Sequence, residues 1–564
     1  MTAATIAAGR RSVLRRLEDL FGFWPLVTLL AFLVVGTLLV LPVFNIVLLS
    51  FSGKEEAAGI IDNYRTFFSE RFYYQTLINS FIVSSAATVG AVAVGLPTAY
   101  FVARYKIWGR TFVRAAVVLT FVSPPFIGSY SWVILFGRSG LISSFLADNG
   151  IFLPSIYGAQ GIIFVFILQF FPFVFLIVSS GLRSIDQSIE DAARNLGSSE
   201  LRTFFTVIVP MLIPSITTGA LLVFVAAFSE FGTPIILGER FRVLPVLIYG
   251  EFVNEFGGRP TFASTLSVLL LAVTCAALVL QRRGAIRFAH GAATIRPLEP
   301  QEQPIAKRIL AAAFVLLLTG FALLPIVNIV VSSFLKANGP VLLAELTLGN
   351  YRQIAATLWT PLSNTILFTT TATLLCAAVG TAVGYIIVRR RSLLSSSLDT
   401  IIMFSYAVPG IVLGVGLVVT YNEPPFVLTG TSLILILAYF IRRLPFSVRS
   451  SVAMLQQISR DTEDASVNLG AGPARTFVKI TVPLVSSAIL SGALLTWSTT
   501  IRELSATLIL QSGQTVTMSV EIFNEVVNAN FGLASALGTI LILLTFWPLV
   551  VLFWGLGKHE EVVV

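Results

Sequence analysis

The sequence has few charged residues and almost no histidine or cysteine. Charged side chains make up 12% of its 564 residues, and there are two histidines and two cysteines. Because soluble domains carry about a quarter charged residues, this composition excludes an ordinary soluble protein. Cys275 and Cys376 both fall inside apolar runs, so they support neither a disulfide framework nor a cysteine-based metal site. The sequence therefore assigns no metal site.

A nucleotide-binding loop is also absent from the sequence. No Gly-x-x-x-x-Gly-Lys-[Ser/Thr] segment occurs in the chain, and this segment forms the phosphate cradle of P-loop ATPases. If the protein works with ATP, we expect a separate subunit to hydrolyse it. The net charge of +9 does not indicate a nucleic-acid partner, because the basic residues lie in short clusters beside apolar runs, where the positive-inside rule places them.

Long hydrophobic runs dominate what is present. Hydrophobic residues make up 56% of the chain and form runs such as Trp24 to Leu49, and about 20 apolar residues suffice to cross a bilayer as a helix. We therefore predict an all-α polytopic membrane protein with about twelve transmembrane helices. The predicted helices cover residues 24–50, 76–103, 112–137, 158–182, 207–236, 262–281, 307–334, 363–388, 398–420, 431–454, 483–511 and 531–556.

The basic residues predict the orientation of these helices. With the N-terminus inside, 25 of the 37 lysines and arginines fall in inside segments, nine fall outside and three fall within predicted helices. Such a bias towards one side is typical of cytoplasmic loops. We therefore expect a multi-pass protein with both termini in the cytoplasm.

An internal repeat divides the chain into two homologous halves. The segment Glu190–Gly197 (EDAARNLG) recurs as Glu463–Gly470 (EDASVNLG), and the matching register extends outward to Glu230 and Glu503. Each half contains an even number of predicted helices, so the two six-helix halves are parallel. The first half covers residues 1–285, a proline-containing cytoplasmic linker covers 286–306, and the second half covers 307–564.

The repeated segment lies in the loop between the fourth and fifth predicted helices of each half. These loops cover about residues 183–206 and 456–479. Acidic residues at the start of each segment favour the positive end of a helix, and Gly197 and Gly470 stand where a left-handed turn ends one. We predict a short rigid helix in each loop that is presented to a partner. The alternative is a helical hairpin that packs only on its own domain.

This pattern of Glu-x-Ala, then glycine, then an apolar stretch and proline resembles the EAA coupling loop of binding-protein-dependent ABC importers. The pattern occurs twice, so the resemblance covers essentially the whole chain. It implies a type I ABC importer-like transmembrane domain in the bacterial inner membrane. The implied coupling residues are Glu190, Asp191, Ala192 and Gly197 in the first half, and Glu463, Asp464, Ala465 and Gly470 in the second.

The resemblance also implies the partners. Two copies of a separate ABC ATPase subunit would bind ATP and Mg, so this chain would need no cofactor of its own and would not itself be an enzyme. An extracytoplasmic substrate-binding protein would deliver the substrate. The other partner is the lipid bilayer.

Several charged residues fall at membrane depth. Charged groups in the bilayer cost several kcal/mol unless they are paired or face water, so they are candidates for function. They are Glu230, Arg442, Arg443, Arg502 and Glu503. Two interpretations stay open, a polar lining or gate of a translocation path, and a structural ion pair between an arginine and Glu503.

The last outside loop is also repeated. Glu251 and Asn254 correspond to Glu525 and Asn528. By resemblance, a short external helix before the last span helps to receive the binding protein, and these four residues are candidates for that contact. The alternative is packing of the loop over the mouth of the pore.

The second half resembles the fused permeases of the ferric-iron importer group in two segments, Phe440–Phe446 and Ile501–Thr507. Ferric iron is therefore the favoured substrate. Phosphonates, sugar phosphates, thiamine and polyamines are alternatives, because permeases for these substrates are closely related to that group. An ion-coupled secondary transporter is the competing class. It would also use repeats, but it would need no coupling loop.

Overall fold

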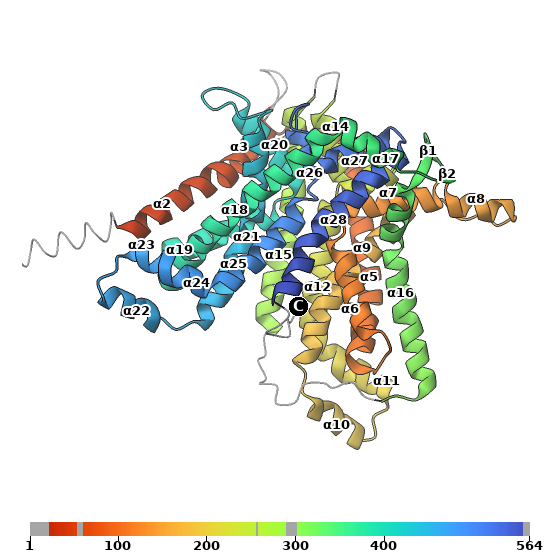
Figure 1. The fold of residues 1–564 in the computed structure, drawn as a ribbon, viewed down its shortest axis with the longest axis horizontal. Coiled ribbons are helices and arrows are strands. Elements are labelled where there is room, and N and C mark those ends of the chain that lie inside the picture. Colours follow the sequence, from red (N-terminus) through yellow and green to blue (C-terminus); the bar gives the residue numbers. More distant parts are fainter. Residues whose placement is uncertain (1–21, 53–59, 255–257, 289–301, 557–564) are drawn as a thin grey trace, which may run out of the picture. The chain divides into compact units, whose positions relative to one another are not determined.

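The computed structural model describes residues 22–52, 60–254, 258–288 and 302–556. These residues are mostly helical (Figure 1). The predicted linker at 286–306 lies largely outside the described residues, between α15 (Pro260–Phe288) and α16 (Ile305–Ser333). Both chain ends, which enter the orientation prediction, also lie outside them.

Eight helices of the described part are long and apolar enough to cross a membrane. They are Phe23–Ser50 (α2, η1 and α3), Arg71–Arg104 (α5), Ala159–Arg183 (α9), Glu200–Ser229 (α11, η2 and α12), Pro260–Gln281 in α15, Ile305–Ser333 (α16), Trp359–Arg389 (α18) and Phe531–Pro548 in α28 (Phe531–Leu556). Within the first of these spans, α2 is Phe23–Val35, η1 Gly36–Val40 and α3 Leu41–Ser50. Seven of these spans have 22 residues or more, which is long enough to cross a hydrocarbon core of about 30 Å at 1.5 Å per residue. The eighth, Phe531–Pro548, has 18 residues and belongs to a helix of 26 residues.

Three further helix pairs are bent, and they raise the count to as many as eleven spans if each pair is one span. They are α6 (Arg110–Val122) with Pro125–Asp148 at 101°, α19 (Leu393–Ala407) with α20 (Gly410–Tyr421) at 109°, and Pro473–Leu484 with α25 (Ser486–Thr500) at 75°. The predicted helices at 112–137 and 398–420 are therefore broken. Pro124 and Pro409 explain the first two bends, because proline pushes the preceding residue out of the helical region.

The predicted count of twelve spans is thus not confirmed. The tenth predicted helix exists as α21 (Ser432–Gln457). It contains Arg442, Arg443 and Arg449, and it is not among the candidate spans.

The other helices connect the long ones or, as α11 and α12 do, form parts of the spans and bent pairs. The helices are α4 (Asp62–Ser69), α7 (Pro125–Phe136), α8 (Leu141–Asp148), α10 (Gln187–Asn195), α11 (Glu200–Thr203), α12 (Val209–Ser229), α13 (Gly232–Leu237), α14 (Leu244–Phe252), α17 (Gly349–Thr357), α22 (Asp461–Asn468), α23 (Pro473–Thr476), α24 (Val482–Leu484), α26 (Ser505–Leu510) and α27 (Met518–Val527). The π-helical segments η2 (Phe204–Ile208) and η3 (Phe477–Thr481) occupy matching positions in the repeat. Strands β1 (Leu335–Asn338) and β2 (Val341–Leu346) pair antiparallel.

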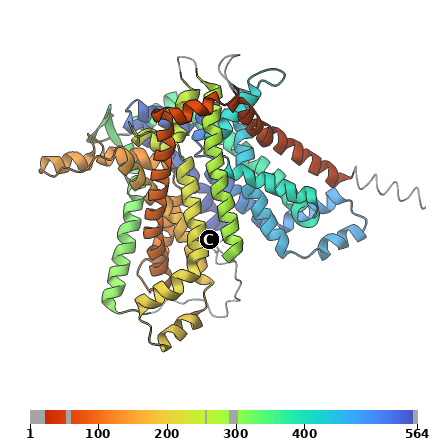
Figure 2. The same cartoon turned by 180° about the vertical axis from the view of Figure 1, so that it is seen from behind.

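The chain forms two compact units, which do not coincide with the two sequence halves. Unit 1 contains residues 1–47, 360–517 and 547–564, and unit 2 contains residues 48–359 and 518–546. The first helix of each half therefore packs with the core of the other half. In unit 1, α2 contacts α19 and α23, and in unit 2, α16 contacts α5, α6 and α7. Figure 2 shows the long helices of unit 2 from behind, running side by side.

An asparagine, buried in unit 2 and half-buried in unit 1, attaches the first helix within each unit. In unit 2, Asn328 of α16 donates to Ser131 Oγ of α7 at 2.8 Å. In unit 1, its repeat mate Asn45 of α3 donates to Thr420 Oγ1 of α20 at 3.0 Å. Side-chain hydrogen bonds of this kind stabilise helix pairs in membranes, so the repeated asparagine helps to explain the composition of the units.

Small residues let the central helices of each unit approach closely. A Cβ on Gly219 of α12 would lie 3.2 Å from Val174 Cα of α9, and one on Gly492 of α25 would lie 3.0 Å from Ser447 Cα of α21. These positions correspond in the repeat. The two units therefore share the same close helix crossing, which is typical of membrane helices with glycine at their interface.

Candidate functional site

The two predicted loop helices are present as α10 and α22. Gly197 and Gly470 follow them with φ angles of +82° and +88°. In this left-handed region, glycine adopts the backbone conformation without the steric penalty that other residues meet. Both helices therefore end where the sequence predicts.

The acidic residue of the first loop is anchored to a long helix. Glu190 forms a buried ion pair with Arg104, the last residue of α5, at 2.5 Å, and the two side chains are 3% and 1% exposed. Arg194, one turn later on α10, pairs with the same carboxylate at 2.8 Å. Glu190 thus faces its own unit rather than the surface, and it joins α10 to the end of α5.

The second loop repeats this anchor. Glu463 accepts hydrogen bonds from Arg389 Nε at 3.2 Å and from Tyr385 Oη at 3.0 Å. Arg389 is the last residue of α18, and it also donates to the carbonyl of Ile458 at 3.0 Å. Both charged side chains are 6% exposed. The same kind of ion pair therefore connects each loop helix to the second span of its half.

Sequence reasoning missed Arg104 and Arg389 as partners. It counted them only among the basic residues that set the orientation. The available signal was the register of the repeat, because each arginine stands at the same spacing after a tyrosine, Tyr100 or Tyr385.

Aromatic contacts fix each loop at a second point. Phe204, at the start of η2, packs edge-to-face on Tyr100 with ring centroids 4.6 Å apart. Its repeat mate Phe477, at the start of η3, packs on Tyr385 at 5.3 Å. Each loop is therefore held to its long helix at two points, by a glutamate within the short helix and by a phenylalanine after it.

An exposed leucine directly follows each loop helix. Leu196 and Leu469 are repeat mates, and they are 89% and 90% exposed. Ala192 and Ala465, one turn earlier, are also exposed, and side chains four residues apart lie on the same helix face. An exposed leucine beside a small residue offers a contact surface for a partner. Sequence reasoning predicted that the alanines allow close approach, but it did not identify the leucines.

Three of the charges predicted at membrane depth form a cluster in unit 1. Glu503, only 6% exposed, pairs with both Arg442 and Arg443 of α21, and the contact with Arg443 is 2.7 Å. Arg443 also donates to the carbonyl of Thr499 at 3.2 Å. The structure thus contains the ion pair that was one of the two open interpretations. A role of this cluster in a translocation path stays a prediction.

The predicted positions of three of these charges within helices are wrong. Glu230 directly follows α12, and its carboxylate accepts from the Gly232 N–H at 3.0 Å. Arg502 and Glu503 lie in the break between α25 and α26. Glu503 accepts from the Ala506 N–H at 3.3 Å. Each glutamate therefore bonds to the short segment that follows the break. Glu230 belongs to unit 2 and the other four charges to unit 1.

We expect replacement of Glu503 by glutamine to lower the stability of the protein by about 3–5 kcal/mol, because two largely buried arginines, 20% and 15% exposed, lose the charge that compensates them. Thermal unfolding of the purified protein measures this. The control is Asp399→Asn, since Asp399 pairs with Arg449 at 3.0 Å with the arginine 48% exposed, and exposed pairs contribute about 0–1 kcal/mol. Equal shifts in the two variants would contradict a structural role of the cluster.

The last outside loops contain the expected short helices, α14 and α27. Glu251, at the end of α14, pairs with Arg259 at 2.9 Å and is 12% exposed. Asn254 and Asn528 are exposed, and Glu525 is half-buried. The contact of Glu251 fits loop packing. Nothing in the structure tests binding of a partner to these four residues.

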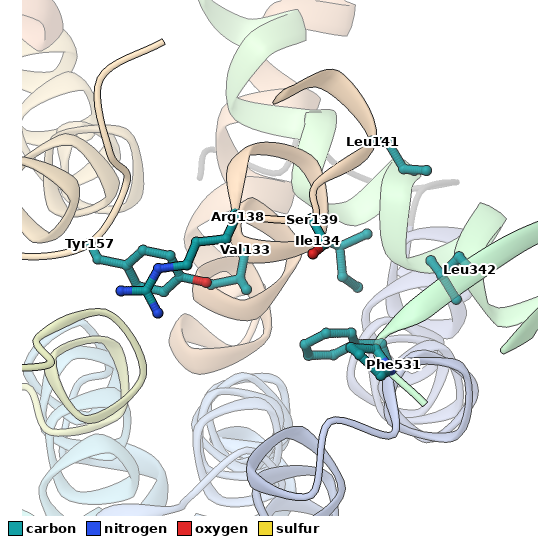
Figure 3. A pocket seen from close by; sticks show the side chains of 10 residues that line it. Val133, Ile134, Arg138, Ser139, Leu141, Tyr157, Leu342 and Phe531 are labelled. Atoms are coloured by element: carbon teal, nitrogen blue, oxygen red, sulfur yellow. The ribbon is translucent and has the colours of Figure 1, made fainter. Parts of the chain in front are cut away.

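Two cavities lie in unit 2 near the end of α5 that is opposite Arg104. One, of 520 Å³, is lined by the arginines Arg71, Arg240 and Arg242 together with Glu239 and side-chain amides. The other, of 170 Å³, is shown in Figure 3, where Arg138 reaches toward Tyr157 and Phe531 lies across the cavity. The Arg138 guanidinium lies over the Tyr157 ring at 5.0 Å and pairs with Glu239 at 2.7 Å. Among the described residues, no group of three or more histidine, cysteine and acidic side chains is arranged to hold a metal ion.

Comparison with known proteins decides the family. Residues 91–283 and 378–557 match the family described as binding-protein-dependent transport system inner membrane component. The chain belongs to this family. As a binding-protein-dependent inner membrane component, it is a multi-pass transport protein, and each of the two matched segments contains one of the loop helices, α10 or α22.

Several transport permeases are similar to this chain, two of them over most of its length. The ferric transport system permease protein FbpB of Actinobacillus pleuropneumoniae is 28% identical over 498 residues, which cover 86% of this chain and 71% of that protein. The Fe(3+)-transport system permease protein FbpB 2 of Haemophilus influenzae is 26% identical over 535 residues, 94% of this chain and 98% of that protein. The molybdate/tungstate transport system permease protein WtpB of Pyrococcus furiosus is 29% identical over 208 residues, 37% of this chain and 76% of that protein.

Proposed function

We propose that this chain is the permease subunit of an ATP-driven ABC importer in the bacterial inner membrane. It works with two copies of a separate ABC ATPase subunit, which bind ATP and Mg, and with an extracytoplasmic binding protein that delivers the substrate. Both termini and both loop helices face the cytoplasm. The observation that carries the proposal is the pair of matching loop helices, each anchored to a long helix by a buried ion pair and each exposing a leucine.

The buried ion pairs of the two loops explain how a movement of the ATPase subunits would be transmitted to the membrane helices. An ATPase groove that holds Leu196 moves α10 when the ATPases close. Glu190 passes this displacement to Arg104 and so to α5, because breaking a buried ion pair costs about 3–5 kcal/mol. Glu463 and Arg389 do the same for α18. Each loop helix and its long helix therefore move together, and they alternate the access of the translocation path.

The opposite end of α5 is suited to the binding protein. The three arginines of the 520 Å³ cavity present positive charge next to α14, and complementary charge speeds the association of two proteins. The candidate contacts Glu251, Asn254, Glu525 and Asn528 lie on or next to α14 and α27. We propose that this end faces outward.

Ferric iron is the proposed substrate, since two relatives that cover most of the chain are named as ferric permeases. An oxyanion is the second candidate. A molybdate/tungstate permease and a probable sulfate permease are similar over about a third of the chain, and two arginines share one glutamate in the buried cluster, which leaves a net positive charge. Phosphonates, sugar phosphates, thiamine and polyamines remain further alternatives.

Reconstitution in liposomes tests this function. The chain, its ATPase and its binding protein are expected to accumulate ferric iron only when ATP is present. Uptake driven by an ion gradient alone would overturn the importer proposal and favour a secondary transporter. ATP-dependent uptake of molybdate or sulfate, with no uptake of ferric iron, would change only the proposed substrate.

Replacing Leu196 and Leu469 with aspartate is expected to weaken ATPase binding by at least about 100-fold, because two apolar contacts are lost and two charges are placed in the interface. Co-purification and titration with the ATPase subunit measure the affinity. Leu393→Asp is the matched control, since Leu393 is equally exposed, at 89%, but starts α19. Unchanged affinity in the double variant would place the ATPase contact elsewhere.

A further inference from the structure

A large apolar cavity lies in unit 2 beside the first loop. It has a volume of 710 Å³ and is bounded by the last turns of α5, by α11 and η2, and by the first turns of α16. Tyr100, Phe204 and Phe314 supply aromatic walls, and Lys307 and Glu200 stand among the few polar residues that line it. Tyr100 and Phe204 are the residues that hold the first loop to α5, so an occupant of this cavity would touch the anchor of that loop.

The internal repeat shows what fills the matching place in unit 1. Tyr385 and Phe477 are the mates of Tyr100 and Phe204, and Trp24 of α2 packs on both. Its ring stacks on Tyr385 with centroids 4.3 Å apart and lies edge-to-face on Phe477 at 5.1 Å. Trp24 is 4% exposed. In unit 1 the chain thus supplies its own flat apolar group to this place.

Unit 2 has no such group at the matching position. The first helices of the two halves align through the motifs Leu41-Pro42 and Leu324-Pro325, each followed by an asparagine three residues after the proline. In this register, Lys307 takes the place of Trp24. The lysine side chain turns to the rim of the cavity, where it pairs with Glu200 at 2.5 Å. The sequence position that holds an indole in unit 1 therefore holds a lysine in unit 2, and the cavity lies beside this lysine.

The side chains at and next to the rim of the cavity are of the kinds that contact lipid headgroups. Lys307 is 54% exposed despite its ion pair. The next residue, Arg308, is outside the lining and lies over the Trp108 ring at 4.3 Å. Tyr105 donates to Glu200 at 2.8 Å, and burial together with this bond raises the pKa of Tyr105, so the phenol stays a neutral donor. Tryptophan, lysine and arginine at the end of a membrane helix are typical of the interface, where they meet phosphate groups.

The surface next to the cavity consists of exposed apolar side chains. Leu310, which lines the cavity, is 72% exposed, and Phe205 and Leu201 are 64% and 73% exposed. In a protein that crosses the membrane, exposed apolar side chains on a span face acyl chains. The apolar lining continues into this surface, which makes an acyl chain the fitting occupant.

We propose that the cavity binds an acyl chain of an anionic phospholipid, with its phosphate at Lys307 and Arg308. The lipid would support the first loop where Trp24 supports the second, so the first loop would depend on the composition of the membrane and the second would not. This proposal concerns binding to the chain itself, and its test does not depend on the proposed transport function.

Photo-crosslinking tests the proposal. The full chain is placed in vesicles of phosphatidylcholine with a minor share of phosphatidylglycerol that carries a photoreactive group in its acyl chain, and labelled peptides are mapped. We expect labelling of residues 97–105 and 305–314. Lys307→Trp, which places the side chain of unit 1 in unit 2, is expected to lower this labelling about tenfold, as is Ala311→Phe, which fills the cavity from another position.

Control variants separate the chain contact from the headgroup contact. Leu317→Trp, on an exposed position of α16 outside the lining, is expected to leave labelling unchanged. Lys307→Gln keeps the cavity open and is expected to remove only the preference for phosphatidylglycerol over an equally labelled phosphatidylcholine. Equal labelling in wild type, Lys307→Trp and Ala311→Phe would overturn the site, and equal labelling by both lipids in wild type would overturn the anionic headgroup.

Discussion

Replacing Glu190 and Glu463 together with glutamine is expected to abolish ATP-driven uptake while the ATPase subunits still bind. Each substitution leaves a buried arginine, Arg104 or Arg389, without its compensating charge, which costs about 3–5 kcal/mol. The loop helices keep their exposed leucines, so the ATPase contact remains. Without the anchor, closure of the ATPases moves the loops and not the long helices. We expect ATP hydrolysis without transport, measured by parallel hydrolysis and uptake assays in liposomes.

A matched control and a double-mutant cycle sharpen this prediction. Asp461→Asn removes the same charge from an exposed position of the second loop, and we expect uptake to stay within about twofold, because exposed charges contribute little. In the first loop, Arg104→Gln added to Glu190→Gln is expected to cost less than the sum of the two single changes, since the partners act as one unit. Wild-type uptake in the glutamine variant, or an equal loss in the control, would contradict the coupling role of the ion pairs.

Replacing Gly197 and Gly470 together with valine is expected to eliminate ATPase-coupled transport without unfolding the membrane helices. The φ angles of +82° and +88° lie in a region that costs ordinary residues about 1–2 kcal/mol each, and a β-branched residue more. No neighbouring atom lies within 4 Å of a Cβ at either position, so the effect would come from the backbone alone. The turn after each loop helix would change direction, and Leu196 and Leu469 would leave their positions.

Gly472→Val is the control for this change, because Gly472 lies two residues after Gly470. Its φ of −68° is ordinary for any residue, and a Cβ there also meets open space. We expect the control to bind the ATPase and to transport at the wild-type rate. Helical content from circular dichroism and elution on size exclusion should match the wild type in all variants. A double valine variant that transports normally would show that the loop geometry is not needed.

Much of the membrane organisation can be predicted from sequence, since it depends on local patterns. Apolar runs predicted long helices such as α5, α9 and α16, and the repeated octet predicted both loop helices with their terminal glycines. Family membership agrees with the resemblance drawn from those loops. The errors in the predicted helix limits were also local. Hydropathy alone predicts continuous helices where Pro124 and Pro409 break them, and it extends two other helices past Glu230 and Glu503, which lie after the helix ends.

The composition of the units and the partners of the buried charges could not be predicted in this way. Glu190 could have faced an ATPase or its own unit, and only packing shows that it meets Arg104, which is distant in the sequence. The pairing of Glu503 with Arg442 and Arg443, and the placing of Trp24 against Tyr385, likewise join distant segments.

The sequence by itself determined that this protein is a helical membrane protein with a repeated loop helix, because solvation and backbone preferences act within a few turns of chain. Only the tertiary structure decided that the motif glutamates are anchors and that the leucines are the exposed surface. It also decided that an apolar cavity lies beside the lysine that takes, in unit 2, the sequence position of the indole in unit 1. Burial and charge pairing depend on which helices pack together, and packing selects among partners that local pattern leaves equivalent.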